Sequence, residues 1–137
     1  MPCKPVGRLV YRAILESGTS EVKVACINDL GPTEANAHLL KYDTVHGILP
    51  TNVAIHGDTI DAGQGPVRVT AEQDPAKLPW KELDIDVALE CTGFFANKEA
   101  AASLFAKKPV HSSATSISSS FHGSFAGSCS AVTRTGP

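Results

Sequence analysis

The spacing of apolar residues predicts alternating helices and strands over roughly the first hundred residues. Between Gly7 and Ser17 apolar side chains recur at helical spacing, and Gly18 is a natural stop for that helix. Residues 21–28 become wholly apolar toward their end, as a buried parallel strand does. The same patterns predict helices at 33–42, capped by Thr33, and at 98–105, a hairpin at 52–60 turning at 56–58, and strands at 66–70 and 85–89. This order predicts an α/β fold with a mainly parallel sheet.

Charge and cysteine usage exclude several classes of protein. The 137 residues carry a formal charge of −2 with acids and bases interspersed, which gives no electrostatic reason to bind nucleic acid or an anionic membrane. No apolar run is long enough to cross a bilayer, and the first residues do not resemble a signal peptide. The four cysteines form no Cys-x-x-Cys pair, which argues against a metal site or a disulfide framework and favours a reducing compartment. Cys26 and Cys91 are interpreted as buried strand residues.

Composition changes sharply near residue 100, which divides the chain into two parts. All fourteen acidic residues lie at or before Glu99, and nine of the nineteen residues from Ser112 to Ser130 are serine. That stretch has neither helical nor strand periodicity and is interpreted as disordered or low-complexity. We therefore expect residues 1–105 to form a partial dinucleotide-binding domain and residues 106–137 to be a serine-rich tail.

One acidic residue stands where a dinucleotide-binding fold needs an acid. Asp29 ends the apolar run of the second expected element and lies 22 residues after Gly7, close to the usual spacing of about 20. A carboxylate accepts hydrogen bonds from ribose hydroxyls but repels a 2′-phosphate, so Asp29 favours NAD over NADP. Taken alone, Asp29 also fits a plain strand-ending acid, because Gly31-Pro32 begins a turn directly after it.

The glycine-rich turn of such a fold is incomplete. Only Gly7 of its three glycines is present, since Pro2 and Lys4 stand where the other two would fall, and no residues remain to form the first strand. Thr92 and Gly93 follow the expected strand 85–89, at an end where a small residue would let a cofactor approach. A plain strand-to-loop glycine explains Gly93 equally well.

Several segments together resemble the glyceraldehyde-3-phosphate dehydrogenase family over roughly residues 6–105. The run Leu-Leu-Lys-Tyr-Asp-Thr-Val-His-Gly is highly specific to that family. The matching segments, in the family's order and spacing, are 7–13, 25–30, 39–47, 74–80 and 90–95. The resemblance implies a Rossmann-type domain that binds NAD and belongs to an oxidoreductase of glycolysis or the Calvin cycle.

The resemblance also assigns roles to single residues. Gly7 resembles the last glycine of Asn-Gly-Phe-Gly-Arg-Ile-Gly, so Gly7 and Arg8 would open the helix that faces the cofactor phosphates. Asp29 resembles the adenosine-ribose acid, with Asn28 beside it. The expected cofactor-binding residues are Gly7, Arg8, Asn28, Asp29, Gln73, Thr92 and Gly93. Gln73 stands where many members carry an arginine near the adenine, so that contact departs from the family.

The family's chemistry requires residues that the resemblance does not reach. Its reaction oxidises glyceraldehyde 3-phosphate to 1,3-bisphosphoglycerate with inorganic phosphate, and uses a cysteine in a Ser-Cys-Thr-Thr segment together with a histidine. Cys129 lacks the following Thr-Thr-Asn and lies in the tail, so no catalytic residue is expected in this chain. The resemblance implies a full-length parent that is a cytoplasmic homotetramer. Erythrose-4-phosphate dehydrogenase and a non-catalytic nucleotide-binding or interaction protein remain alternatives.

The two ends of the chain depart from the family pattern. Residues 1–6 replace the first strand, and the tail replaces a later strand, which is consistent with a reading-frame error in a partial sequence. Without its first strand the sheet would expose unpaired edges on the strands to either side. We therefore expect an incomplete and poorly folded domain.

Overall fold

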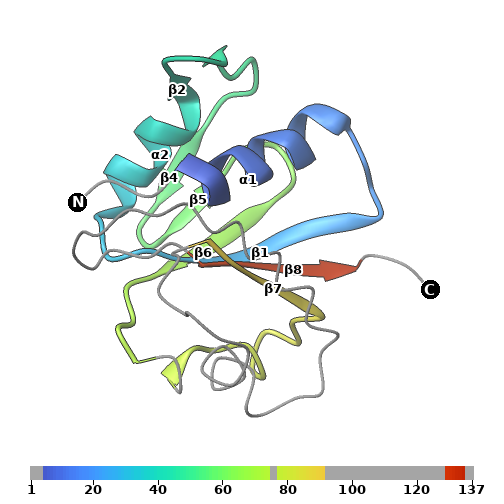
Figure 1. The fold of residues 1–137 in the computed structure, drawn as a ribbon, viewed down its shortest axis with the longest axis vertical. Helices are drawn as coiled ribbons and strands as arrows, with labels where there is room; N and C mark the ends of the chain where they lie inside the picture. The colour runs from blue at the N-terminus through green and yellow to red at the C-terminus, as the bar shows by residue number, and fades with distance from the viewer. Residues whose placement is uncertain (1–4, 75–76, 92–128, 135–137) are drawn as a thin grey trace, which may run out of the picture.

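The computed structural model describes residues 5–74, 77–91 and 129–134, which form a sheet with two helices on one face (Figure 1). The six-stranded sheet has the order β4-β5-β6-β1-β8-β7, and β2 and β3 form a separate small hairpin. The helices are α1 (Pro5–Ser17) and α2 (Thr33–Lys41), and the strands are β1 (Val22–Asn28), β2 (Tyr42–Asp43), β3 (Gly47–Ile48), β4 (Ala54–His56), β5 (Thr59–Asp61), β6 (Pro66–Thr70), β7 (Val87–Glu90) and β8 (Cys129–Arg134). The helices and the parallel pairing of β1 with β6 confirm the α/β class of Rossmann type. The described sheet is mixed and not mainly parallel as predicted, because its other four strand pairings are antiparallel.

Both helices expected before residue 50 are present. Gly18 ends α1 with a φ of 64°, and its N–H donates to the carbonyl oxygen of Leu15 at 3.3 Å. The N-cap of α2 is Pro32, with no side-chain capping bond, so the predicted capping role of Thr33 is wrong. Thr33 is already the first residue of the helix, because Pro32 holds the extended conformation that precedes a helix. The helix predicted at 98–105 lies outside the described residues.

The strands that surround the expected site are close to their predicted positions. β1 and β6 pair in parallel, with Asn28 opposite Thr70. β4 and β5 form the predicted hairpin, which turns at Gly57 and Asp58, and β5 then pairs antiparallel to β6. The strand expected at 85–89 begins two residues later, at Val87. Ile85 is 2% exposed but precedes the strand, so its apolar character reflects burial alone.

A strand that the sequence patterns did not predict occupies the middle of the sheet. β8 lies between β1 and β7 and is antiparallel to both, with Cys129 opposite Asn28 on one side and Glu90 on the other. The expectation that the stretch from Ser112 to Ser130 has no strand structure is therefore wrong for its last two residues, which begin β8. The expectation of unpaired edges is also wrong for the facing edges of β1 and β7, because β8 supplies backbone partners to both.

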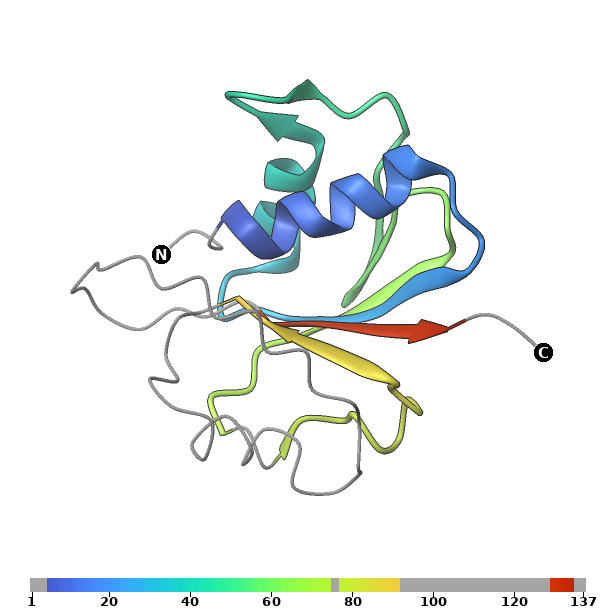
Figure 2. The ribbon, with the colours of Figure 1, turned by 45° about the vertical axis from the view of Figure 1, so that its right-hand side comes forward.

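The sheet carries a buried cluster on each side. The larger cluster joins Tyr11 of α1 and Leu40 of α2 to inward-facing residues of β1, β5 and β6. The smaller one contains Cys26, Ile85 and Ala88, with Trp80 and Leu83 packed against it. Figure 2 shows the two helices above the sheet and the segment that leads into β7 below it. Apolar burial on both sides holds β1 in place within the sheet. The end of β1 carries the candidate site.

Candidate cofactor site

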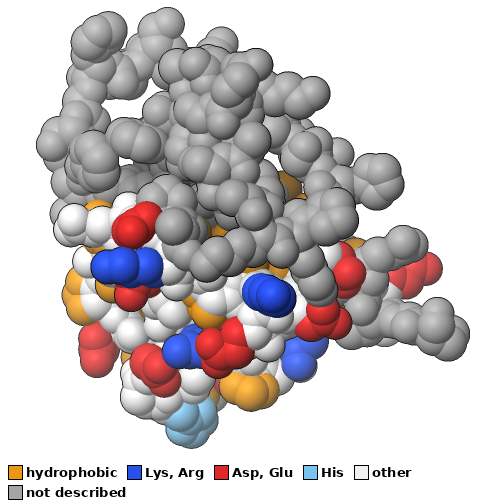
Figure 3. Space-filling view, turned by 90° about the horizontal axis from the view of Figure 1, so that it is seen from below, with side chains coloured by type: hydrophobic (Ala, Val, Ile, Leu, Met, Phe, Trp, Pro, Cys, Tyr) orange, Lys and Arg blue, Asp and Glu red, His pale blue; other side chains and the backbone are white. Residues whose placement is uncertain are grey.

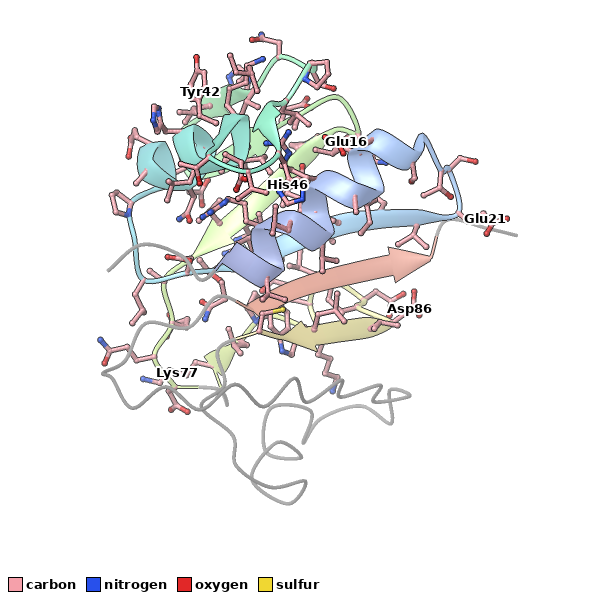
Figure 4. The ribbon with its side chains drawn as sticks, turned by 45° about the horizontal axis from the view of Figure 1, so that its top comes forward. Glu16, Glu21, Tyr42, His46, Lys77 and Asp86 are labelled. Atoms are coloured by element: carbon pink, nitrogen blue, oxygen red, sulfur yellow. The ribbon has the colours of Figure 1, made fainter. Side chains whose placement is uncertain are left out.

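Three strands end at the same edge of the sheet. β6 is parallel to β1, and β8 is antiparallel to both β1 and β7, so β6, β1 and β7 all run in one direction. Glu21 and Asp86, which precede β1 and β7, lie together at the opposite edge in Figure 4. Helix α1 starts on the side where β1 ends (Figure 2). Open α/β sheets bind ligands beyond the carboxyl ends of their strands, so this edge is the candidate site.

Asp29 stands directly after β1 at this edge and is 2% exposed. Its backbone N–H donates to the carbonyl oxygen of Thr70 at 2.8 Å, which continues the pairing of β1 with β6 by one residue. Carboxylate atom Oδ1 accepts the backbone N–H of Gly31 at 2.7 Å. Atom Oδ2 is buried and has no hydrogen-bond partner among the residues that the structure describes. A buried carboxylate oxygen without a partner is costly, and a ligand hydroxyl group would satisfy it.

Gly31 allows the chain to turn closely around this carboxylate. A Cβ atom added at Gly31 would lie 3.0 Å from Oδ1 of Asp29, which is tighter than an ordinary van der Waals contact. Asn36 of α2 packs behind the turn and donates through Nδ2 to the carbonyl oxygens of Gly31 and Pro32, both at 3.3 Å. The turn therefore fixes the orientation of the Asp29 carboxylate before any ligand arrives.

Asn28 lies at the same strand end, but its side-chain amide is hydrogen-bonded to other residues of the protein. Its side chain is 6% exposed and bonds Thr70 and the backbone of Glu72, at distances between 2.8 and 3.0 Å. The sequence placed Asn28 beside the cofactor but gave no sign of these partners, which lie more than 40 residues further along the chain. Thr70 and Glu72 are thus site residues that the sequence patterns missed.

Gly7 and Arg8 lie in the first turns of α1. Gly7 is buried, and atom Nη2 of Arg8 lies 3.8 Å from Oδ2 of Asp43. Asp43 also accepts the backbone N–H groups of Val45 and His46, at 2.9 and 2.8 Å, and these two hydrogen bonds lower the pKa of its carboxyl group to about 2. Figure 4 places His46 close to α1. The Arg8 guanidinium is therefore engaged with the β2–β3 hairpin.

The remaining predicted site residues fall into two groups. Gln73 is exposed and follows β6 at the candidate edge, one residue after Glu72. Thr92 and Gly93 lie outside the described residues, although Glu90 and Cys91 lead toward the same edge. Cys26 is fully buried in β1 as predicted, whereas Cys91 is half-buried and follows β7, so its prediction as a buried strand residue is wrong. Burial raises the pKa of the Cys26 thiol, so it behaves as a packing residue and not as a nucleophile.

Metal sites, membrane spans and charged surfaces each have requirements that can be compared with the described residues. In the part of the chain that the structure describes, no three His, Cys, Asp or Glu residues gather closely enough to hold a metal ion. Helices in that part are also too short or too polar to span a membrane. On the face shown in Figure 3, acidic and basic side chains are mixed without a patch of one sign.

Comparison with known proteins connects this edge to a family. Residues 5–98, more than half of the chain, match the model of the glyceraldehyde 3-phosphate dehydrogenase NAD binding domain. The chain belongs to this family. The family model is that of an NAD-binding domain, so the cofactor is NAD.

Relatives in the glyceraldehyde-3-phosphate dehydrogenase family are similar over the same region. The chain is 57% identical over 97 residues to the enzyme of Xanthobacter flavus and 54% identical over 97 residues to that of Cereibacter sphaeroides. It is 46% identical over 96 residues to the enzyme of Thermotoga maritima. These matches cover 70–71% of the chain but only 28–29% of each relative. The chain therefore spans less than a third of the length of these relatives.

The described residues fit the adenosine end of NAD. Atom Oδ2 of Asp29 is buried without a hydrogen-bond partner in the described part of the chain, and the carboxylate that carries it is held in place by Gly31. A ribose hydroxyl is a donor that this atom lacks, whereas a 2′-phosphate beside a carboxylate would be repelled. Asp29 would therefore hold the adenosine ribose, and the exposed residues after β6 would border the adenine.

Proposed function

We propose that this chain is the adenosine-binding part of an NAD-dependent, phosphorylating glyceraldehyde-3-phosphate dehydrogenase. The observation that carries the proposal is the buried Oδ2 atom of Asp29 at the carboxyl end of β1, which has no hydrogen-bond partner among the described residues. The family match and the relatives' names support a dehydrogenase that acts on glyceraldehyde 3-phosphate. The uptake of inorganic phosphate is what the family resemblance implies. NAD supplies the hydride acceptor when bound, and the described residues bind and orient its adenosine end.

The proposal assigns the chemical step to residues outside the family match. Cys26 is buried, and its raised pKa leaves the thiol protonated. Cys129 begins a strand that the match at 5–98 does not include. From the family resemblance we further propose that the full-length parent is a cytoplasmic homotetramer that acts in glycolysis or the Calvin cycle.

Binding measurements with purified 137-residue chain test the proposal. Titration calorimetry should give a lower Kd for NAD than for NADP. Asp29→Asn keeps an oxygen for the Gly31 N–H but removes the charge, so it should weaken NAD binding about tenfold or more, as expected for a hydrogen bond to a charged group. The difference between the Kd values for NAD and NADP should also become smaller in this variant, because the repulsion of a 2′-phosphate disappears.

A matched control separates the local role of Asp29 from a general effect of charge. Asp58 is exposed in the β4–β5 turn, so Asp58→Asn removes the same charge elsewhere and should leave the Kd for NAD unchanged. Absence of NAD binding by the wild-type chain, or equal binding by the wild type and Asp29→Asn, would overturn the proposal.

A further inference from the structure

The side chain of Asn28 closes a hydrogen-bonded junction between the ends of β1 and β6. Its Oδ1 atom accepts from the Thr70 hydroxyl at 2.9 Å and from the Glu72 backbone N–H at 2.8 Å. Its Nδ2 atom donates to the Glu72 carbonyl oxygen at 3.0 Å. Both polar groups of the Glu72 backbone are thus bound to a single side chain, which is 6% exposed. We call these residues, Asn28, Thr70 and Glu72, the strand-end junction.

The strand-end junction lies directly beside the carboxylate assigned to the ribose. Asn28 precedes Asp29 in the chain, and the Asp29 N–H donates to the carbonyl oxygen of Thr70. Beyond Thr70 the pairing of β6 with β1 has ended, so the residues that follow have no strand partner to fix them. Asn28 replaces the missing backbone ladder for Glu72, and thereby sets the path of the exposed chain that includes Gln73.

The chemistry of an amide is specifically required at position 28. One oxygen must accept two donors while a neighbouring nitrogen donates to a carbonyl, and a side-chain amide offers both functions at this spacing. A carboxylate would face the Glu72 carbonyl oxygen with a second oxygen at about the same distance. It would also place a second negative charge beside Asp29.

We propose that Asn28 is a positioning residue for NAD, which acts by holding the chain after β6 against the adenosine end of the site. The inference rests on the proposed binding of NAD at this edge. The Asn28 amide is hydrogen-bonded within the protein. Asn28 therefore affects the binding of NAD indirectly, by holding the Glu72 backbone. Asn28 thus positions the chain that borders the site, whereas Asp29 binds the ribose.

Two variants of different severity test this role. Asn28→Ala removes all three side-chain hydrogen bonds, whereas Thr70→Val keeps the side-chain volume and removes only the hydroxyl that donates to Asn28. We expect Asn28→Ala to weaken the binding of NAD and of AMP alike, each by about tenfold, and Thr70→Val by about threefold. AMP is the informative probe because it contains only the adenosine end.

Gln64→Ala provides a matched control. Gln64 is half-buried and makes a comparable side-chain bond, from Nε2 to the carbonyl oxygen of Thr19 at 3.3 Å. Thr19 precedes β1 and Gln64 precedes β6, so this bond lies at the edge opposite the candidate site. Gln64→Ala should lower the melting temperature without changing the Kd for NAD or AMP.

Amide hydrogen exchange without ligand keeps this inference distinguishable from the proposed function. The Glu72 amide should exchange at least tenfold faster in Asn28→Ala than in the wild type, and unchanged exchange would overturn the junction itself. If the wild type and Asn28→Ala bind NAD and AMP equally, Asn28 has no positioning role while the proposed function stands. If the wild type protects Glu72 yet binds neither ligand, the proposed function fails and this role fails with it.

Discussion

The backbone N–H of Asp29 donates to the carbonyl oxygen of Thr70 at 2.8 Å, one residue beyond the last paired position of β1 and β6. This hydrogen bond links the residue assigned to the cofactor ribose to a strand that arrives 41 residues later in the chain. Asp29 follows the last residue of β1, and this hydrogen bond ties its backbone to the end of the sheet, which restricts its motion before binding. A preorganised acceptor of this kind binds at a lower cost in conformational entropy.

Adding a methyl group at Gly31 should damage the site with only a modest loss of stability. In Gly31→Ala the new Cβ would meet Oδ1 of Asp29 at 3.0 Å, so the carboxylate must shift. We expect a loss of about 1–2 kcal/mol in the free energy of unfolding from overpacking, with NAD binding weakened about tenfold. Chemical denaturation and titration calorimetry measure the two effects. As control, Gly18→Ala strains a residue with a φ of 64° far from the site, and should lose stability alone.

Tyr11 should control stability at alkaline pH. Burial, and secondarily the charge of Asp61, raise the pKa of the Tyr11 phenol from 10.0 to about 12. Because the folded pKa is the higher one, the resulting stabilisation is complete below pH 10 and is lost as the pH rises through about 12. Urea midpoints of the wild type should fall over this window more steeply than those of Tyr11→Phe. Identical slopes for the two proteins would contradict the assigned pKa.

Removing the Tyr11 hydroxyl should also be tolerated at neutral pH. Tyr11 is 1% exposed, and its hydroxyl oxygen is buried without a hydrogen-bond partner among the residues that the structure describes. Taking away a buried polar group that lacks a partner should leave stability unchanged or raise it by about 1 kcal/mol. The urea midpoint of Tyr11→Phe at pH 7 measures this, and a loss above that size would reveal a partner for the hydroxyl.

Asp43 should make the β2–β3 hairpin sensitive to acid. Hydrogen bonds from the backbone N–H groups of His46 and Val45 lower the pKa of Asp43 from 3.8 to about 2. A lowered folded pKa gives stability that is present above the unfolded value of about 4 and is lost as the pH falls toward 2. Between pH 4 and 2 the wild type should therefore lose stability more steeply than Asp43→Asn. Asp58→Asn, which alters an exposed turn, should keep the wild-type slope.

Strand β8 should be required for cooperative folding. Ala131 lies opposite both Cys26 and Ala88, in the middle of the sheet. Ala131→Pro removes a backbone donor from a central strand and should cost about 3 kcal/mol or more, a large part of the 5–15 kcal/mol that typically stabilises a domain. Thermal unfolding followed by circular dichroism should show a lower or broadened transition. An Ala131→Pro chain that unfolds as the wild type does would refute the position of β8.

Local patterns were sufficient for the elements whose burial is encoded in their own residues. The run that ends at Asn28 is apolar because β1 is covered on both sides, and Asp29 follows it at a spacing typical of dinucleotide folds. Ile85 misled the prediction because an apolar residue can be buried next to a strand as well as within one. The position of Asp29 was therefore predictable, while the exact start of β7 was not.

Long-range relationships could not be read from the sequence. The partners of Asn28 are Thr70 and Glu72, and only the parallel pairing of β1 with β6 brings them together. β8 is specified by the open edges of β1 and β7, whose backbone groups need partners, more than by any pattern within Cys129–Arg134. Such features depend on which hydrogen-bonding groups elsewhere in the chain would otherwise lack partners.

We propose that the carboxyl edge of β1 and β6 binds the adenosine end of NAD. The most direct test is a two-dimensional NMR titration of the isotopically labelled chain with NAD, which reports on each backbone amide. We expect shifts at Asp29, Gly31 and Gln73, and none at Gly18 or Gln64 at the opposite edge. Shifts confined to the opposite edge, or no shifts at saturating NAD, would contradict it.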